Sequence, residues 1–189
     1  MTTNVNWLEV LALVVLVLAA AFFAASEAAL VSVSRLRARG MLERGLKEAN
    51  AVLELLDDRN RFLTSILVAN TIVLLGADSL ATFLFIQAGV PYAAVISTVV
   101  MTVVFLLFGE IIPKTVAVTD SDRWALRLAP SMLRIAWILT PVVRTFLFLT
   151  DFLVRPFGVP PHARQIFVTE EDIRTLVTVG ADQKVLEDT

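Results

Sequence analysis

Long hydrophobic stretches alternate with short polar segments along this chain. Three stretches are long enough to cross a bilayer as helices, which needs about 20 mainly apolar residues. We therefore predict membrane-spanning helices at about residues 7–34, 62–86 and 92–118. The segment "QAGVP" between the second and third stretches contains a glycine and a proline, which indicates a tight turn.

The polar segment after the first span contains a second pattern. Residues 36–58 are charged, yet apolar residues recur in them at helical spacing. These apolar residues are Met41, Leu42, Leu46, Val52, Leu55 and Leu56. The pattern predicts one or two short amphipathic helices that lie on the membrane surface.

Residues 123–157 allow two interpretations. They are apolar enough for a fourth span, but Pro130, Pro141, Arg134 and Arg144 interrupt them. At about 100° per residue, the charged residues fall on one side of a helix. These residues are Arg123, Arg127, Arg134, Arg144, Asp151 and Arg155. Because a central arginine costs about 2.5–3.5 kcal/mol in a span, we favour a kinked belt helix in the membrane interface.

Composition supports an all-α integral membrane protein. Hydrophobic residues make up 57% of the 189 positions, above the 45–50% typical of soluble domains, and the mean hydropathy is +0.78. The net charge of −2, without a basic cluster, argues against a nucleic-acid partner. The chain has no cysteine and a single histidine, His162, which excludes zinc sites built from cysteines or several histidines.

Basic residues predict the orientation in a plasma (inner) membrane. Lys and Arg concentrate in cytoplasmic loops. They follow the first predicted span and the end of the third, at Arg35, Arg37, Arg39, Arg44, Lys47, Lys114, Arg123 and Arg127. The N-terminus is then outside and the C-terminus cytoplasmic.

Two domains are expected. Residues 1–158 form a transmembrane domain, and residues 159–189 form an acidic cytoplasmic helical linker. In the linker, Thr169 before "EED" has the pattern of a helix N-cap. We expect the chain to be truncated shortly after this helix.

Oxygen-bearing side chains occur at similar predicted depths in all three spans. Glu110 lies ten residues before Asp120, about 15 Å deep at about 1.5 Å per residue. Asn70 and Ser26 each lie nine residues from an arginine that borders their span. A carboxylate inside a span is a functional-site hypothesis by default.

The sequence "GEIIP" predicts an irregular backbone at the same depth in the membrane. Pro113 lacks an N–H and clashes with the carbonyl of Gly109, so we expect a helix break that turns this carbonyl and the Glu110 carboxylate toward one cavity. Every available donor is a hard oxygen, which suits Mg²⁺, Ca²⁺, Mn²⁺ or Na⁺.

Structural roles remain open for each candidate residue. Ser26 could belong to a small-residue packing face, Asn70 could join two helices by a hydrogen bond, and Pro113 could be a structural kink. Glu27 could lie near the cytoplasmic surface, pair with a basic residue or touch an ion. Asp78 could be a charge of the outer vestibule or a packed, protonated acid.

Three motifs resemble the transmembrane domain of the CNNM/CorC family of magnesium transporters. They are "FFAASEAALVSVSRLRARG", "LVANT" and "GEIIPKTVA", and "TEEDIRTLV" resembles the helix that leads into that family's cytoplasmic nucleotide-binding domains. The resemblance implies a homodimer, with three spans, a belt helix and a helical linker in each protomer. It also implies a dehydrated Mg²⁺ held between the spans and moved outward, with Na⁺ as the candidate coupling ion.

Matching motif positions assign the metal ligands as Ser26, Asn70, Gly109 and Glu110, with Pro113 as the helix break. Two departures, Ala24 for a common serine and Leu74 for a second asparagine, remove possible oxygen donors. We expect a Mg²⁺ transporter that works by alternating access. The alternative is a membrane-embedded Mg²⁺ sensor. An intramembrane enzyme is not favoured, because no nucleophile–base pair is visible.

Overall fold

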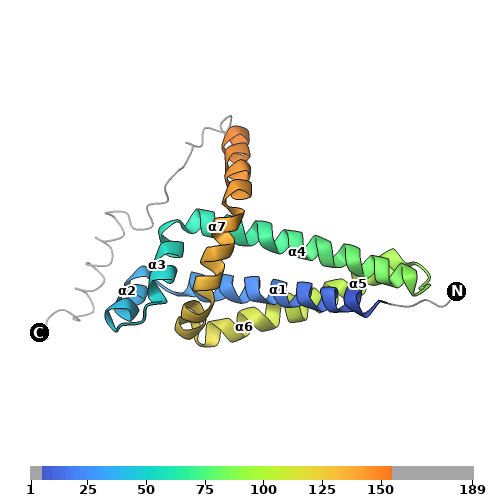
Figure 1. Cartoon of the computed structure of the whole chain (residues 1–189), viewed down its shortest axis with the longest axis horizontal. Coiled ribbons are helices and arrows are strands. Elements are labelled where there is room, and N and C mark those ends of the chain that lie inside the picture. Colours follow the sequence, from blue (N-terminus) through green and yellow to red (C-terminus); the bar gives the residue numbers. More distant parts are fainter. Residues whose placement is uncertain (1–5, 155–189) are drawn as a thin grey trace, which may run out of the picture. The chain divides into compact units, whose positions relative to one another are not determined.

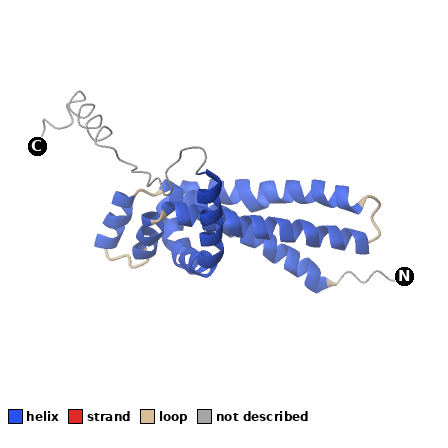
Figure 2. Ribbon diagram, turned by 90° about the horizontal axis from the view of Figure 1, so that it is seen from above, coloured by secondary structure: helices blue, strands red, loops and turns tan. Residues whose placement is uncertain are grey.

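The structure is a computed structural model that describes residues 6–154, with only the backbone described at Asp151 and Val154. Every regular element in this range is a helix (Figure 2). The predicted linker at 159–189, with Thr169 and His162, lies outside the described residues, as does Arg155. The chain divides into two compact units, residues 1–145 and 146–189, and the fold described below is that of the first.

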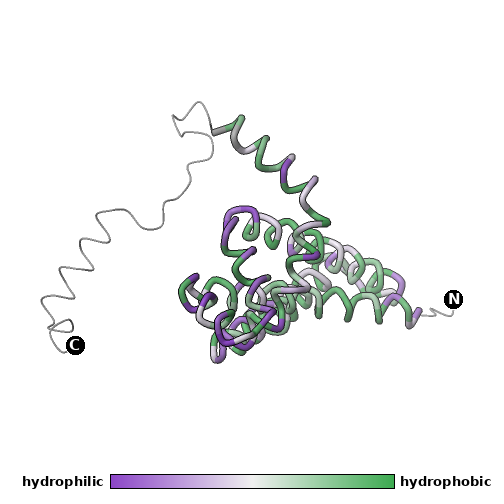
Figure 3. The backbone as a smooth tube through the Cα atoms, turned by 60° about the vertical axis from the view of Figure 1, so that its left-hand side comes forward, coloured by the Kyte–Doolittle hydropathy of each residue, from purple (hydrophilic) through white to green (hydrophobic). Residues whose placement is uncertain are grey.

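Three long helical segments lie side by side (Figure 1). Helix α1 (Trp7–Ser32) packs against α4 (Arg59–Gln87) and against the second half of the third segment. The third segment runs without interruption from Ala93 to Thr119. These bounds agree with the three predicted spans to within a few residues. Hydrophobic residues predominate along the long helices (Figure 3).

Defined caps set the ends of these helices. The Asn6 and Asp58 side chains accept hydrogen bonds from Leu8 N and Arg61 N at the starts of α1 and α4. At the end of α4, Gly89 has φ 72°, and Val90 N–H donates to Phe85 O. This is a Schellman motif, whose left-handed residue is most easily a glycine. It forms the tight turn that "QAGVP" predicts.

Two short helices follow α1. They are α2 (Arg35–Glu43) and α3 (Ala49–Asp57), in agreement with the predicted surface helices. Arg35 holds the pair together, because its guanidinium donates to Leu56 O at 2.8 Å and lies 3.1 Å from Asp57 Oδ1. Since they connect the end of α1 to the start of α4, α2 and α3 mark one end of the bundle.

Helix α7 (Ser121–Val154) contains both Pro130 and Pro141. One of its faces is buried, at Ala125, Ala129, Met132, Ala136 and Val143. The predicted charged side of this helix is exposed at each of its described arginines: Arg123, Arg127, Arg134 and Arg144.

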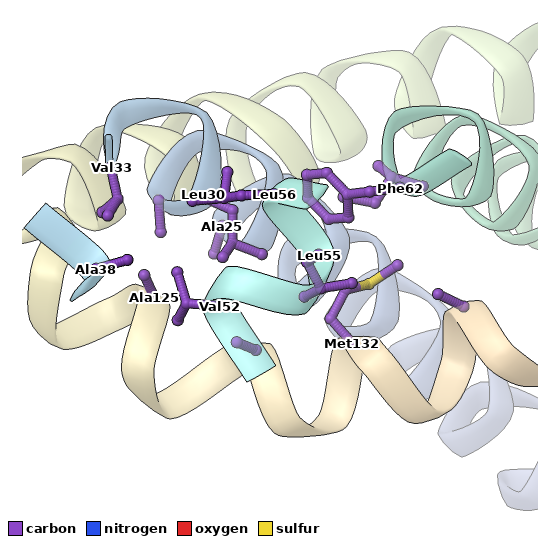
Figure 4. Close-up of a cluster of buried hydrophobic side chains, with 14 of the residues drawn as sticks. Ala25, Leu30, Val33, Ala38, Val52, Leu55, Leu56, Phe62, Ala125 and Met132 are labelled. Carbon is purple, nitrogen blue, oxygen red and sulfur yellow. The ribbon is translucent and has the colours of Figure 1, made fainter. Parts of the chain in front are cut away.

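The buried face of α7 packs on the α2–α3 end of the bundle. Ala125 and Met132 belong to one buried cluster with Val52 and Leu55 of α3 and Phe62 of α4 (Figure 4). Asp122 accepts a hydrogen bond from Arg37 of α2 at 3.3 Å, and Thr140 accepts one from Arg61 of α4. The part of α7 from Asp122 to Thr140 is therefore held at each end by a hydrogen bond to an arginine near the end of a long helix.

Length and composition make four helices candidate spans in residues 6–154: α1, α4, Ala93–Thr119 and the Ser121–Thr150 part of α7. The all-helical membrane fold is thus clear from the structure. The fourth candidate is the segment for which we favoured the interface, and hydropathy alone does not separate the two arrangements.

Candidate ion-binding site

The third long segment changes its helix type at the candidate site. It comprises α5 (Ala93–Val104), the π-helix η1 (Phe105–Ile111) and α6 (Ile112–Thr119). Ile112 N–H donates to Leu107 O, five residues back. Where we expected a break before Pro113, the chain therefore stays helical with a widened turn. Such π-helical turns are rare and occur frequently at functional sites.

Gly109 brings this widened turn close to α1. It is buried, and a Cβ atom added to it would lie 3.0 Å from Phe105 Cδ1 and 3.5 Å from the Ala20 Cβ of α1. Ala20 is itself buried in a cluster with Ala77, Met101 and Phe105. A Cβ at position 109 would therefore press on the Phe105 ring of the same turn and stand in van der Waals contact with α1, which leaves no room there for a larger side chain.

Ser26 lies in α1, about 9 Å further along the helix than Ala20, at about 1.5 Å per residue. It is fully buried, and its hydroxyl donates a hydrogen bond to Phe22 O at 2.7 Å. Because the hydrogen points to that carbonyl, the oxygen lone pairs can still accept or ligate. Ala24, Ala25 and Ala29 of the same helix are buried as well, so the packing role stays open.

Asn70 lies in α4, which packs against α1, as η1 does. Its side chain is half-buried, and its neighbour Ala69 belongs to the same buried cluster as Ala25. Ser26 and Asn70 therefore come from adjacent helices. Whether they share one ion with Glu110 stays a prediction.

Glu110 takes part in an ion-pair cluster that sequence analysis missed. Lys114, one helical turn later, places Nζ 2.9 Å from Glu110 Oε1 and 3.1 Å from Glu27 Oε2 of α1. Of the interpretations considered for Glu27, the structure shows pairing with a basic residue. The spacing of Glu110 and Lys114 could have suggested their contact, since side chains four residues apart meet on a helix.

Within residues 6–154, no group of three or more His, Cys, Asp or Glu side chains comes close enough together to hold a metal ion. Neutral oxygens would therefore have to supply most ligands to a cation at Glu110. A pocket of about 570 Å³ lies elsewhere, between α3, α4 and α7, where Asp58, Arg61, Arg134 and Trp137 line part of it.

Several long apolar helices, with one carboxylate at a π-helical turn, define a multi-pass membrane protein. The family model described as the Cyclin M transmembrane N-terminal domain matches residues 11–189. The chain therefore belongs to the CNNM family, in agreement with the resemblance of its motifs.

Curated relatives support the same assignment. A UPF0053 protein of Synechocystis is 30% identical over 96% of this chain and 43% of its own length. The UPF0053 inner membrane protein YfjD of Escherichia coli is 27% identical over 86% of this chain and 38% of its own length. A Haemophilus influenzae relative named polyamine export protein is 28% identical, over 94% and 44%. The chain thus spans less than half the length of each of these relatives.

Proposed function

We propose that this chain is the membrane part of a divalent-cation transporter that exports Mg²⁺, with Na⁺ as the candidate coupling ion. Ser26, Asn70, the Gly109 carbonyl and Glu110 would ligate the ion. The observation that carries the proposal is Glu110 itself: a carboxylate on an apolar helix, at a π-helical turn that packs closely on α1. A π-turn alters backbone hydrogen bonding locally, and irregular backbone at a membrane site is characteristic of transporters.

Donor chemistry supports a hard cation. The four proposed ligands supply carboxylate, amide, hydroxyl and carbonyl oxygens, the types preferred by Mg²⁺. Only Glu110 carries a charge among them. The Ser26 hydroxyl donates its hydrogen to Phe22 O, so its lone pairs remain available to ligate an ion. A homodimer, and cytoplasmic domains beyond residue 189, belong to the same proposal and rest on the family.

Within this proposal, α1, α4 and the α5–α6 segment span the bilayer, and α7 lies in the cytoplasmic interface. The contacts of α7 support this arrangement. Asp122 and Thr140 are about 27 Å apart along a helix, nearly a bilayer core, at about 1.5 Å per residue. Yet their partners, Arg37 and Arg61, both border the same end of the bundle. A spanning helix would have carried Thr140 to the other end.

Cysteine labelling tests the position of α7, because the chain contains no native cysteine. We expect single variants Arg123→Cys and Arg144→Cys to react with a membrane-impermeant maleimide from the cytoplasmic side only, in inverted vesicles. As a control, Ala88→Cys at the exposed end of α4 should react only from the opposite side. Labelling of positions 123 and 144 from opposite sides would show that α7 crosses the membrane.

Polyamine export is a second candidate. The Haemophilus influenzae relative carries that name, and one feature of this chain favours it: Glu27 and Glu110 together hold a primary ammonium, that of Lys114. Polyamines present the same chemical group. A Mg²⁺ sensor that binds the ion without moving it is the remaining alternative.

Flux through the purified protein in liposomes distinguishes these functions. We expect an inward Mg²⁺ gradient to produce a signal from a trapped magnesium indicator, with protein-free liposomes as the control. Mg²⁺ binding without flux would indicate a sensor. Spermidine flux without Mg²⁺ flux would indicate a polyamine exporter, and either result contradicts Mg²⁺ transport.

A further inference from the structure

Lys114 has no part in the ligand set proposed above, yet it contacts its only charged member. Its ammonium lies between two carboxylates from different helices, Glu110 on η1 and Glu27 on α1. All three side chains are about equally accessible, with 36–49% of their surface exposed. A divalent ion bound at Glu110 would have to approach an oxygen that the ammonium already occupies.

The charges of this cluster explain why a cation belongs there. The two carboxylate oxygens lie within about 6 Å of each other, because both contact one nitrogen, and like charges at this separation repel each other. The ammonium offsets one of the two negative charges. With a divalent ion added, the net charge of the cluster changes from −1 to +1, so neither state is strongly charged.

We propose that Lys114 is a built-in competitor for the ion: its ammonium holds Glu110 when the site is empty, and an arriving divalent cation displaces it onto Glu27. This inference rests on the proposed function and concerns the same site. It assigns to Lys114 the role of limiting the ion's affinity so that the ion can leave again. A transported ion must bind well enough to enter and weakly enough to leave.

The geometry makes such an exchange inexpensive. The lysine side chain is a flexible four-carbon stem that ends in a compact charge with three donors. Because Glu27 is already within 3.1 Å of the ammonium, losing Glu110 does not leave it unpaired. A divalent ion has twice the charge of the ammonium, so at equal distance its Coulomb attraction to the same carboxylate is twice as strong.

A purely structural role predicts the opposite effect. If Lys114 only joined α6 to α1, its removal would loosen the site and weaken ion binding. If Lys114 competes with the ion, its removal strengthens binding. The sign of the change in affinity therefore separates the two roles.

The test measures Mg²⁺ affinity by titration calorimetry on the full chain in lipid nanodiscs. For Lys114→Met we expect binding at least about tenfold tighter, because an occupying charge is gone. For Glu27→Gln we expect weaker binding, because the ammonium then has only Glu110 as a partner. The double variant should bind like Lys114→Met alone, because Glu27 acts through Lys114.

Several outcomes would overturn this role. Unchanged or weaker binding by Lys114→Met would exclude competition, and a double variant weaker than Lys114→Met would make Glu27 a direct ligand. Lys114→Arg, which keeps the charge, should not bind more tightly than wild type. Should Lys114→Met fail to fold, Glu27→Gln still decides, since unchanged or tighter binding contradicts the inference.

Glu110→Gln separates this inference from the proposed function. If the wild type binds no divalent ion, or Glu110→Gln binds as well as the wild type, the proposed ion site itself is wrong. If Glu110→Gln loses binding while Lys114→Met leaves it unchanged, only the competitor role of Lys114 is wrong.

Discussion

Glu110→Gln is expected to lower Mg²⁺ flux in liposomes by about 100-fold or more, since loss of residues that merely support a metal ligand already costs about 10–100-fold. The substitution keeps the size of the side chain and removes the only charge among the proposed ligands. The protein should still fold, because Lys114 retains its ion pair with Glu27 at 3.1 Å. Loss of flux would then report on the ion and not on the scaffold.

The matched control for this variant is Glu43→Gln, an equal change of charge on the exposed surface of α2. It should transport like the wild type. Size-exclusion profiles of both variants verify folding. Wild-type flux through Glu110→Gln would contradict the proposed site, even if the family assignment stands.

Gly109→Val is expected to lower the melting temperature and to abolish Mg²⁺ flux. The new Cβ lies 3.0 Å from the Phe105 ring and 3.5 Å from Ala20, so the two methyl groups of valine have no room unless Phe105 or the backbone of η1 shifts. Overpacking of this kind typically costs about 1–3 kcal/mol of stability. A shift of η1 also moves the Gly109 carbonyl and Glu110. We therefore expect Mg²⁺ flux to be lost even at temperatures where the variant is still folded.

Gly76→Val on α4 is the control, because an added Cβ there meets no atom within 4 Å. Both variants place the same side chain in a long apolar helix, but only one lies at a close helix contact. Thermal unfolding in detergent and flux in liposomes measure both effects. Equal behaviour of the two variants would show that the approach of η1 to α1 does not matter.

Several features of the fold could be read directly from local sequence. The apolar runs predict three long helices, and the Gly89 turn follows because its left-handed φ suits a glycine. The surface helices α2 and α3 follow from apolar residues at helical spacing. These predictions succeed because each depends on neighbours within a few positions along the chain.

The candidate site was only partly predictable. The motifs indicate Glu110 and Gly109, and Pro113 indicates a disturbed helix, since it removes one backbone donor. How the helix absorbs that loss depends on what packs against it. Here the chain widens into a π-helix while Gly109 lies against Ala20, a contact between residues far apart in sequence.

By itself, the sequence determined a helical membrane protein of the CNNM family with a carboxylate in an apolar segment, because hydrophobic length and short motifs are local properties. Only the tertiary structure decided that Lys114 contacts Glu27 as well as Glu110, and that Asp122 and Thr140 of α7 both contact arginines at one end of the bundle. These contacts join different helices, and hydropathy cannot specify them, because it measures how readily a segment leaves water and not which neighbour it meets.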